Sequence, residues 1–129
     1  MILVDSSVWI ARLRGQETPA VQKLRTLVER EPMLVGDLIM AEVLQGARDD
    51  AQAARIERAL RRYAVVSLID PDLAPRAARN YRVLRGLGVT VRKTIDVIIG
   101  TWCIERGHAL LHDDRGFDPM AAHLGLRVA

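Results

Sequence analysis

Four acidic residues of this chain could together hold a divalent cation: Asp5, Glu42, Asp96 and Asp114. Carboxylate oxygens are the hard ligands that Mg²⁺ and Mn²⁺ prefer in proteins. Such ions orient a water nucleophile and neutralise the charge of a phosphodiester during hydrolysis. Four carboxylates in one cleft would repel one another and take up protons unless a cation lay among them. This chemistry therefore requires a fold that brings the four acids together.

Each acid also has a purely structural explanation. Asp5 and Asp96 could be acids at helix N-termini, where the helix dipole stabilises a negative charge by roughly 0.3–1 kcal/mol. Asp114 could be a solvated turn residue. Glu42 is harder to explain in this way, because its helical neighbours are apolar and a charge beside an apolar face needs a partner. Ser7 could cap the first helix, or its hydroxyl could hold a water at a metal site near Asp5.

The densest group of acids is the stretch LLHDDRGFD at residues 110–118. If strand geometry continues through it, Asp113 points to the face opposite Asp114. Asp118 precedes Pro119 and is therefore expected to be the N-cap of a last helix. The chain has no His/Cys grouping with zinc-site spacing and no glycine-rich phosphate loop, so the acids remain the candidate metal ligands.

Short apolar runs alternate with helical segments along the chain. The runs predict strands at residues 2–4, 33–36, 64–69 and 108–112, with a further candidate at 126–128. Helices are expected at residues 6–14, 19–31, 38–47, 50–62, 70 to 86–88, 94–106 and from 118 onward. Thr18 and Asp37 are expected N-caps, and Gly107 is expected to end the longest apolar helix. This alternation favours a mostly parallel sheet of about four to five strands flanked by helices.

A parallel sheet would place the four acids on one edge. Asp5 follows the first expected strand, and Asp114 follows the fourth. Glu42 and Asp96 lie near the starts of expected helices. Strand C-termini and helix N-termini share the edge where such folds place their ligands. The order of the strands, and hence the distance between the acids, is not determined by their spacing.

Length and composition favour one domain spanning residues 1–129. Half of the residues are apolar, which is enough for a hydrophobic core. No apolar run is long enough to span a bilayer, and the first ten residues lack the positive region of a signal peptide. The single cysteine, Cys103, is expected to be buried and inert, and it fits a reducing compartment. We therefore expect a cytoplasmic protein with no membrane partner.

The basic residues favour a nucleic-acid partner. The formal net charge is +3, and seventeen of the nineteen basic residues are arginine. Arginine presents a planar fork that suits phosphate groups. A GC-rich coding sequence would produce the same bias, so the charge alone does not decide the partner.

Four segments of the chain resemble the PIN-domain ribonucleases, and in particular the VapC toxins of bacterial toxin–antitoxin pairs. They are ILVDSSVWI, AEVLQG, TIDVIIGTWCIERG and LLHDDRGF, in this order. The resemblance covers essentially the whole chain. It implies a single PIN-like α/β domain and a Mg²⁺- or Mn²⁺-dependent endoribonuclease, the toxin of a type II pair, with structured RNA such as tRNA or rRNA as substrate.

The resemblance also implies residue roles and partners. Asp5, Glu42, Asp96 and Asp114 match the acidic quartet, and Ser7 matches the small polar residue of the first motif. Proteins similar to this one commonly form homodimers. A VapB-type antitoxin silences them in a hetero-oligomer by covering the acidic groove, often with a basic side chain that replaces the charge of the cation.

Gly116 is the one departure from this pattern. Many similar proteins carry an acid at this position, so a second metal held entirely by protein ligands is in doubt here. Gly116 could serve a tight turn or a positive φ angle. It could also leave room for a phosphate or for an antitoxin side chain.

Two other functions remain open. The first is a PIN-type nuclease that acts on DNA. The second is a non-catalytic module similar to signalling receiver domains, which use acids at the same edge of a sheet. That class usually carries an acidic pair after the first strand, whereas here one acid and two serines follow it.

Overall fold

The computed structural model describes all residues, 1–129, and contains one parallel four-stranded sheet. The strand order is β3-β2-β1-β4. The strands are β1 (Ile2–Val4), β2 (Met33–Gly36), β3 (Ala64–Val66) and β4 (Ala109–Leu111). The central strand β1 pairs with β2 on one side and with β4 on the other. This order confirms the parallel sheet and places the end of the first strand beside the end of the last.

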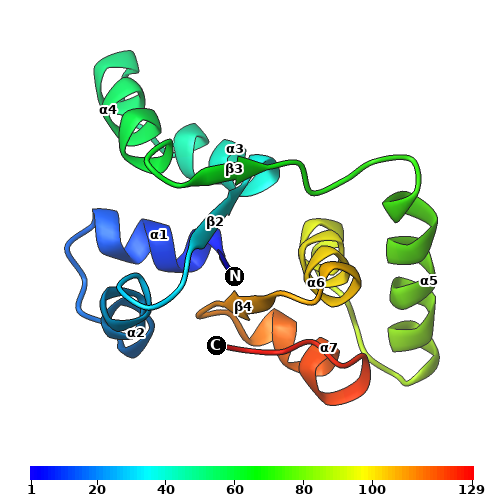
Figure 1. The fold of residues 1–129 in the computed structure, drawn as a ribbon. Helices are drawn as coiled ribbons and strands as arrows, with labels where there is room; N and C mark the ends of the chain where they lie inside the picture. The colour runs from blue at the N-terminus through cyan, green and yellow to red at the C-terminus, as the bar shows by residue number, and fades with distance from the viewer.

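Seven helices flank the sheet, as expected for a parallel α/β fold. They are α1 (Ser6–Leu13), α2 (Pro19–Leu27), α3 (Asp37–Gln45), α4 (Asp50–Leu60), α5 (Leu73–Gly86), α6 (Thr94–Arg106) and α7 (Asp118–His123), with the short 3₁₀ helix η1 (Arg115–Phe117) before the last. Helices α1 to α4 gather on one side of the strands, and α5 to α7 lie on the other (Figure 1). None of them combines the length and the apolar character that a membrane-spanning segment needs.

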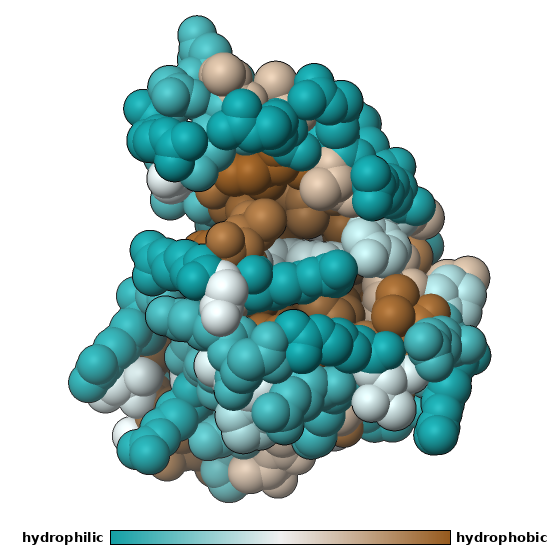
Figure 2. Space-filling model, turned by 90° about the vertical axis from the view of Figure 1, so that its left-hand side faces the viewer, coloured by the Kyte–Doolittle hydropathy of each residue, from teal (hydrophilic) through white to brown (hydrophobic).

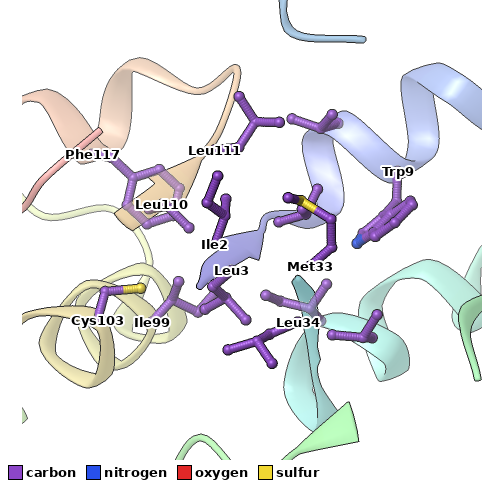
Figure 3. Close-up of a cluster of buried hydrophobic side chains, with 14 of the residues drawn as sticks. Ile2, Leu3, Trp9, Met33, Leu34, Ile99, Cys103, Leu110, Leu111 and Phe117 are labelled. Atoms are coloured by element: carbon purple, nitrogen blue, oxygen red, sulfur yellow. The ribbon is translucent and has the colours of Figure 1, made fainter. Parts of the chain in front are cut away.

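One hydrophobic core of 27 buried residues joins these layers. Side chains of β1, β2 and β4 meet those of α6 there, where Cys103 and Ile99 face the strands (Figure 3). Strands β1 and β2 are buried on both faces, which explains why they read as continuous apolar runs rather than alternating ones, whereas the edge strand β3 is largely exposed. Cys103 is fully buried, and this burial raises the pKa of its thiol to about 12, so the expectation of an inert thiol is confirmed.

Several expected boundaries were too long. The helix expected at residues 19–31 ends at Leu27, because residues 28–31 form turns instead. The strand expected at residues 64–69 ends at Val66. The candidate fifth strand is reduced to one isolated bridge between Leu110 and Val128, so the sheet has four strands.

Two expected helix caps were also wrong. Asp37 is the first residue of α3 rather than its cap, and its Oδ1 accepts the N–H of Leu68 across the end of β2 (3.1 Å). Asp118 likewise opens α7 from inside, since Phe117 occupies the N-cap position. Asp49, by contrast, caps α4 by accepting the N–H of Gln52. In each wrong case the helix begins one residue earlier than the acid suggested.

Candidate metal and nuclease site

Asp5 lies at the point where β1 ends and α1 begins. It is the N-cap of α1, and its Oδ2 accepts the Ser7 N–H (3.1 Å) and the Ser7 hydroxyl (2.6 Å). Its own N–H donates to the carbonyl of Leu111 (2.9 Å), which ties it to the end of β4. The side chain is only 3% exposed. The capping explanation is therefore correct, but the cap also holds a buried carboxylate in a fixed orientation at the edge of the sheet.

Glu42 reaches the same edge from α3, which packs against α1. Its Oε1 accepts the Ser6 hydroxyl (3.3 Å), so both serines of the first motif support an acid. Desolvation and the negative charge of Asp5 raise the pKa of Glu42 above its ordinary value. The hydroxyl of Ser6 and the charge of Lys93 oppose this rise but do not cancel it.

Asp96 lies in the first turn of α6 and is 8% exposed. Burial and the charge of Asp5 raise the pKa of its carboxyl from 3.8 to about 6, although the nearby Lys93 opposes the rise. A buried carboxylate that gains stability from a proton gains still more from a divalent cation. This environment is unlike that of an ordinary acid at a helix N-terminus, which is solvated and stabilised by the dipole.

Asp114 lies three residues after β4 and caps η1, with its Oδ1 accepting the N–H of Gly116 (2.8 Å). It is partly buried, and its charge contributes to the raised pKa values of Asp96 and Glu42. Asp5 and Asp114 follow neighbouring strands, their charges act on both Asp96 and Glu42, and the carboxylates of Asp96 and Asp114 both face Gly116. The four predicted acids therefore lie on one edge of the sheet.

The other aspartates of the 110–118 stretch stay outside this group. Asp113 is exposed; only its backbone N–H reaches the site, where it donates to the Ser7 Oγ (3.1 Å). Asp118 is exposed at the start of α7. His112 packs on Phe117 with ring centroids 4.9 Å apart, and its Nδ1 accepts the N–H of Asp114 (3.1 Å). Both contacts hold His112 against η1 and Asp114.

Gly116 faces the carboxylates directly. Its φ angle is not positive, so the explanation based on a left-handed backbone is wrong. A Cβ atom at this position would lie 3.2 Å from Asp114 Oδ1 and 3.2 Å from Asp96 Oδ2. Since contacts this short force the neighbours to move, the glycine keeps space open between two of the four acids.

Lys93 is a site residue that the sequence did not reveal. It is the N-cap residue of α6, and its Nζ lies 3.6 Å from Asp114 Oδ2. The charges of Asp96 and Asp114 raise the pKa of Lys93 above its ordinary value. The one sequence signal for Lys93 is its position three residues before Asp96, which is about one helix turn away.

These residues fit a Mg²⁺ or Mn²⁺ ion. The donors are carboxylate oxygens, two of the acids are buried, and burial and neighbouring acids raise the pKa of two of them. No three of the side chains stand close enough to enclose an ion by themselves. That openness suits Mg²⁺, which keeps several waters and usually binds through one or two carboxylates together with substrate phosphate.

Known proteins are similar to this chain along its whole length. The PIN domain family model matches residues 2–122. Ribonuclease VapC11 of Mycobacterium tuberculosis is 31% identical over 131 residues, covering 100% of this chain and 98% of its own. The chain belongs to the PIN-domain family of VapC ribonucleases.

Solved structures of the VapC family have the same fold. VapBC2 of Rickettsia felis, bound to a DNA fragment from its promoter, has a TM-score of 0.79 at 13% identity and covers 100% of this chain and 98% of the other. Mycobacterium tuberculosis VapC20, described as a sarcin–ricin loop cleaving toxin, has a TM-score of 0.68 at 18% identity with 95% of each chain covered. At these identities the similarity concerns the fold alone.

Proposed function

We propose that this VapC-family chain is a Mg²⁺- or Mn²⁺-dependent endoribonuclease that hydrolyses phosphodiester bonds in RNA. The observation that carries the proposal is the set of four acids, two of them buried, that share one edge of the sheet next to Lys93. A nuclease needs this combination because the acids hold a cation while a basic side chain binds the phosphate.

Each side chain has a separate part in the proposed reaction. The metal ligands would be Asp5 and Asp96. Ser7 fixes the carboxylate of Asp5, and no hydrogen-bond donor contributes to the pKa of the Asp96 carboxylate. Asp114 completes the set from the end of β4. The raised pKa of Glu42, caused by burial and Asp5, suits a group that accepts a proton from the attacking water. The bound ion supplies charge neutralisation at the phosphate and activation of water.

Lys93 binds the substrate in this proposal. Its side chain is 58% exposed and its ammonium group already lies beside Asp114, so it can contact a non-bridging phosphate oxygen without a change in the fold. Its charge also keeps the acidic cluster from repelling the RNA backbone before a cation arrives. Arginines around the site extend this positive surface, as the composition suggested.

We further propose that the protein is the toxin of a type II pair, with tRNA or rRNA as its substrate and a VapB-type antitoxin as its inhibitor. Relatives support both parts, because one is described as cleaving the sarcin–ricin loop and another was solved as a VapBC complex.

The side of the molecule that carries α1, α2 and α4 also exposes apolar surface within a hollow beneath α4 (Figure 2). A hydrophobic hollow rimmed by polar side chains is typical of a protein-binding surface. A homodimer, and a hetero-oligomer with the antitoxin, are expected on the same family grounds.

Cleavage by the purified protein tests the proposal directly. Structured RNA should be cut in Mg²⁺ or Mn²⁺ and left intact in EDTA, and Asp5→Asn should reduce cleavage at least 100-fold. Asp113→Asn is the matched control, because this acid is exposed and its carboxylate contacts no site residue. Single-stranded DNA of the same sequence is assayed in parallel. Equal cleavage of DNA would favour the DNA nuclease, and wild-type rates for Asp5→Asn would refute the assigned site.

A further inference from the structure

A cavity of about 570 Å³ opens directly beside the acidic cluster. It shares Asp96, Asp114 and Gly116 with the site and extends away from them, between the end of α5, the 87–93 segment, α6 and η1. Its volume lies within the range of roughly 300–1,000 Å³ that small-molecule sites occupy. The cavity is therefore large enough for one nucleotide and is continuous with the point where the phosphate is cut.

The lining of the cavity divides into an apolar part and a basic part. Apolar side chains form much of its wall: Leu84, Val89, Val91, Val97 and Met120. Three cations also line it: Arg92, Lys93 and Arg115. Of these, Lys93 pairs with Asp114, whereas Arg92 and Arg115 form no ion pair. A pocket with a partly apolar wall beside unpaired cations matches a nucleotide, whose base is apolar on both faces and whose phosphates are anionic.

The wall of the cavity is held in place by the end of α5. Three backbone hydrogen bonds close this end, from Leu87 to the Val83 carbonyl, from Gly88 to Arg85, and from Val89 to Leu84 (3.0–3.1 Å). Gly88 has a φ of +79°, the left-handed conformation that ends helices in this way. Val89 is thus held by a hydrogen bond to the buried Leu84, which fixes the start of the 89–93 segment of the wall.

We propose that this cavity is a subsite for one unstacked nucleotide that flanks the scissile phosphate of the RNA. The base enters among the aliphatic side chains, and Arg92 and Arg115 bind the adjoining phosphates. A base within a helix is stacked on its neighbours and cannot enter a pocket of this kind. The subsite therefore selects loops, bulges and other single-stranded positions as cleavage sites. The inference deepens the proposed ribonuclease function and rests on it for the identity of the substrate.

Binding of mononucleotides tests the subsite without any cleavage step. Methyl NMR spectra of the Mg²⁺-loaded protein are recorded with AMP, CMP, GMP or UMP, and separately with ribose 5-phosphate. At least one mononucleotide should shift the methyl signals of Leu84, Val89 and Met120, whereas ribose 5-phosphate should leave them unchanged. Equal shifts with ribose 5-phosphate would show that the base stays outside and would overturn the proposal. Shifts with a blocked arginine peptide but with no mononucleotide would assign the cavity to a protein partner instead and would also overturn it.

A pair of variants from the same segment provides the matched comparison. Thr90 is exposed on the rim of the cavity, and Thr90→Trp should fill it and abolish the mononucleotide shifts. Leu87 is 55% exposed and does not line the cavity, so Leu87→Trp should bind as the wild type does. Equal mononucleotide binding by the two variants would contradict the proposed position of the base. Thermal unfolding of both variants verifies that they fold.

RNA cleavage then connects the subsite to the reaction. In a set of RNAs with one abasic nucleotide each, a single position beside the cleavage point should lower kcat/KM about tenfold, because burial of a base against aliphatic side chains contributes roughly this much to affinity. Thr90→Trp should lose this dependence, and Leu87→Trp should keep it. A uniform effect at all positions would refute the subsite. If no RNA is cleaved at all, the proposed function fails, while the NMR comparison still decides whether the cavity binds a nucleotide.

Discussion

Replacing Asp96 with asparagine should abolish cleavage and stabilise the metal-free protein. The reason is the raised pKa of this carboxyl, from 3.8 to about 6, which burial and Asp5 cause. Each pKa unit corresponds to about 1.4 kcal/mol, so the ionised side chain opposes folding by up to about 3 kcal/mol. Asparagine has nearly the same shape and cannot ionise, so it removes this cost. A stabilising substitution in a functional site is typical of sites that hold like charges together.

Because the pKa of Asp96 is raised in the folded state, the stability difference between wild type and Asp96→Asn should grow as the pH rises. Below about pH 4 the carboxyl is protonated in both the folded and the unfolded state, and Asp96→Asn should change the free energy of unfolding little. Between about pH 4 and 6 the folded protein binds a proton that the unfolded chain has released, so wild-type stability falls as the pH rises. Above pH 6 the full difference between the two proteins should be present.

Urea unfolding from pH 4 to 8 in EDTA measures this difference. The variant should be more stable by about 2–3 kcal/mol at pH 7.5, which corresponds to an increase in Tm of roughly 10 °C for a chain of this size. Mg²⁺ should stabilise the wild type more than the variant. Asp113→Asn, on the exposed neighbour of Asp114, should stay within about 0.5 kcal/mol of the wild type. A variant that is equally or less stable at pH 7.5, or a difference that does not change with pH, would refute the reasoning.

Three further substitutions test the surroundings of the acids. Gly116→Ala places a Cβ 3.2 Å from two carboxylate oxygens. Titration with Mn²⁺ should show weaker metal binding, and the free energy of unfolding should fall by about 1–3 kcal/mol. Unchanged Mn²⁺ affinity would show that the space is not used. Lys93→Ala removes the cation 3.6 Å from Asp114. It should raise KM for RNA more than it lowers kcat, and Lys93→Arg should recover part of this loss. A lower kcat with an unchanged KM would contradict phosphate binding by Lys93. Ser7→Ala removes the hydroxyl donor to Asp5. The free energy of unfolding in urea should fall by roughly 1 kcal/mol, and the cleavage rate should also fall. An unchanged cleavage rate would show that the N-cap hydrogen bond alone orients Asp5.

Much of the fold could be predicted because the central strands β1 and β2 are buried on both faces and therefore stand out as short apolar runs. The starts of β1 and β2 and the extent of α6 were correct for this reason. Boundaries failed where local signals were ambiguous. Asp37 and Asp118 have the side chain of an N-cap residue, but tertiary contacts and the preceding residue decide whether the helix starts at the acid or before it.

The four acids could be found from their positions beside strand ends and helix starts, but their convergence could not. It depends on the strand order, which places β1 between β2 and β4. Lys93 could not be found, because a lysine before a helix is usually solvated and only the folded chain shows its proximity to Asp114. The roles of the acids in metal binding and catalysis remain predictions that the variants above will test.

The backbone hydrogen bond from Asp5 to Leu111 has a consequence for protein synthesis. The first acid of the site is made at once, but the strand that fixes its position and the aspartate that follows this strand are made more than one hundred residues later. A growing chain on the ribosome therefore cannot assemble the four carboxylates until β4 and Asp114 have left the exit tunnel. The site is therefore incomplete while the first hundred residues of this chain are being made.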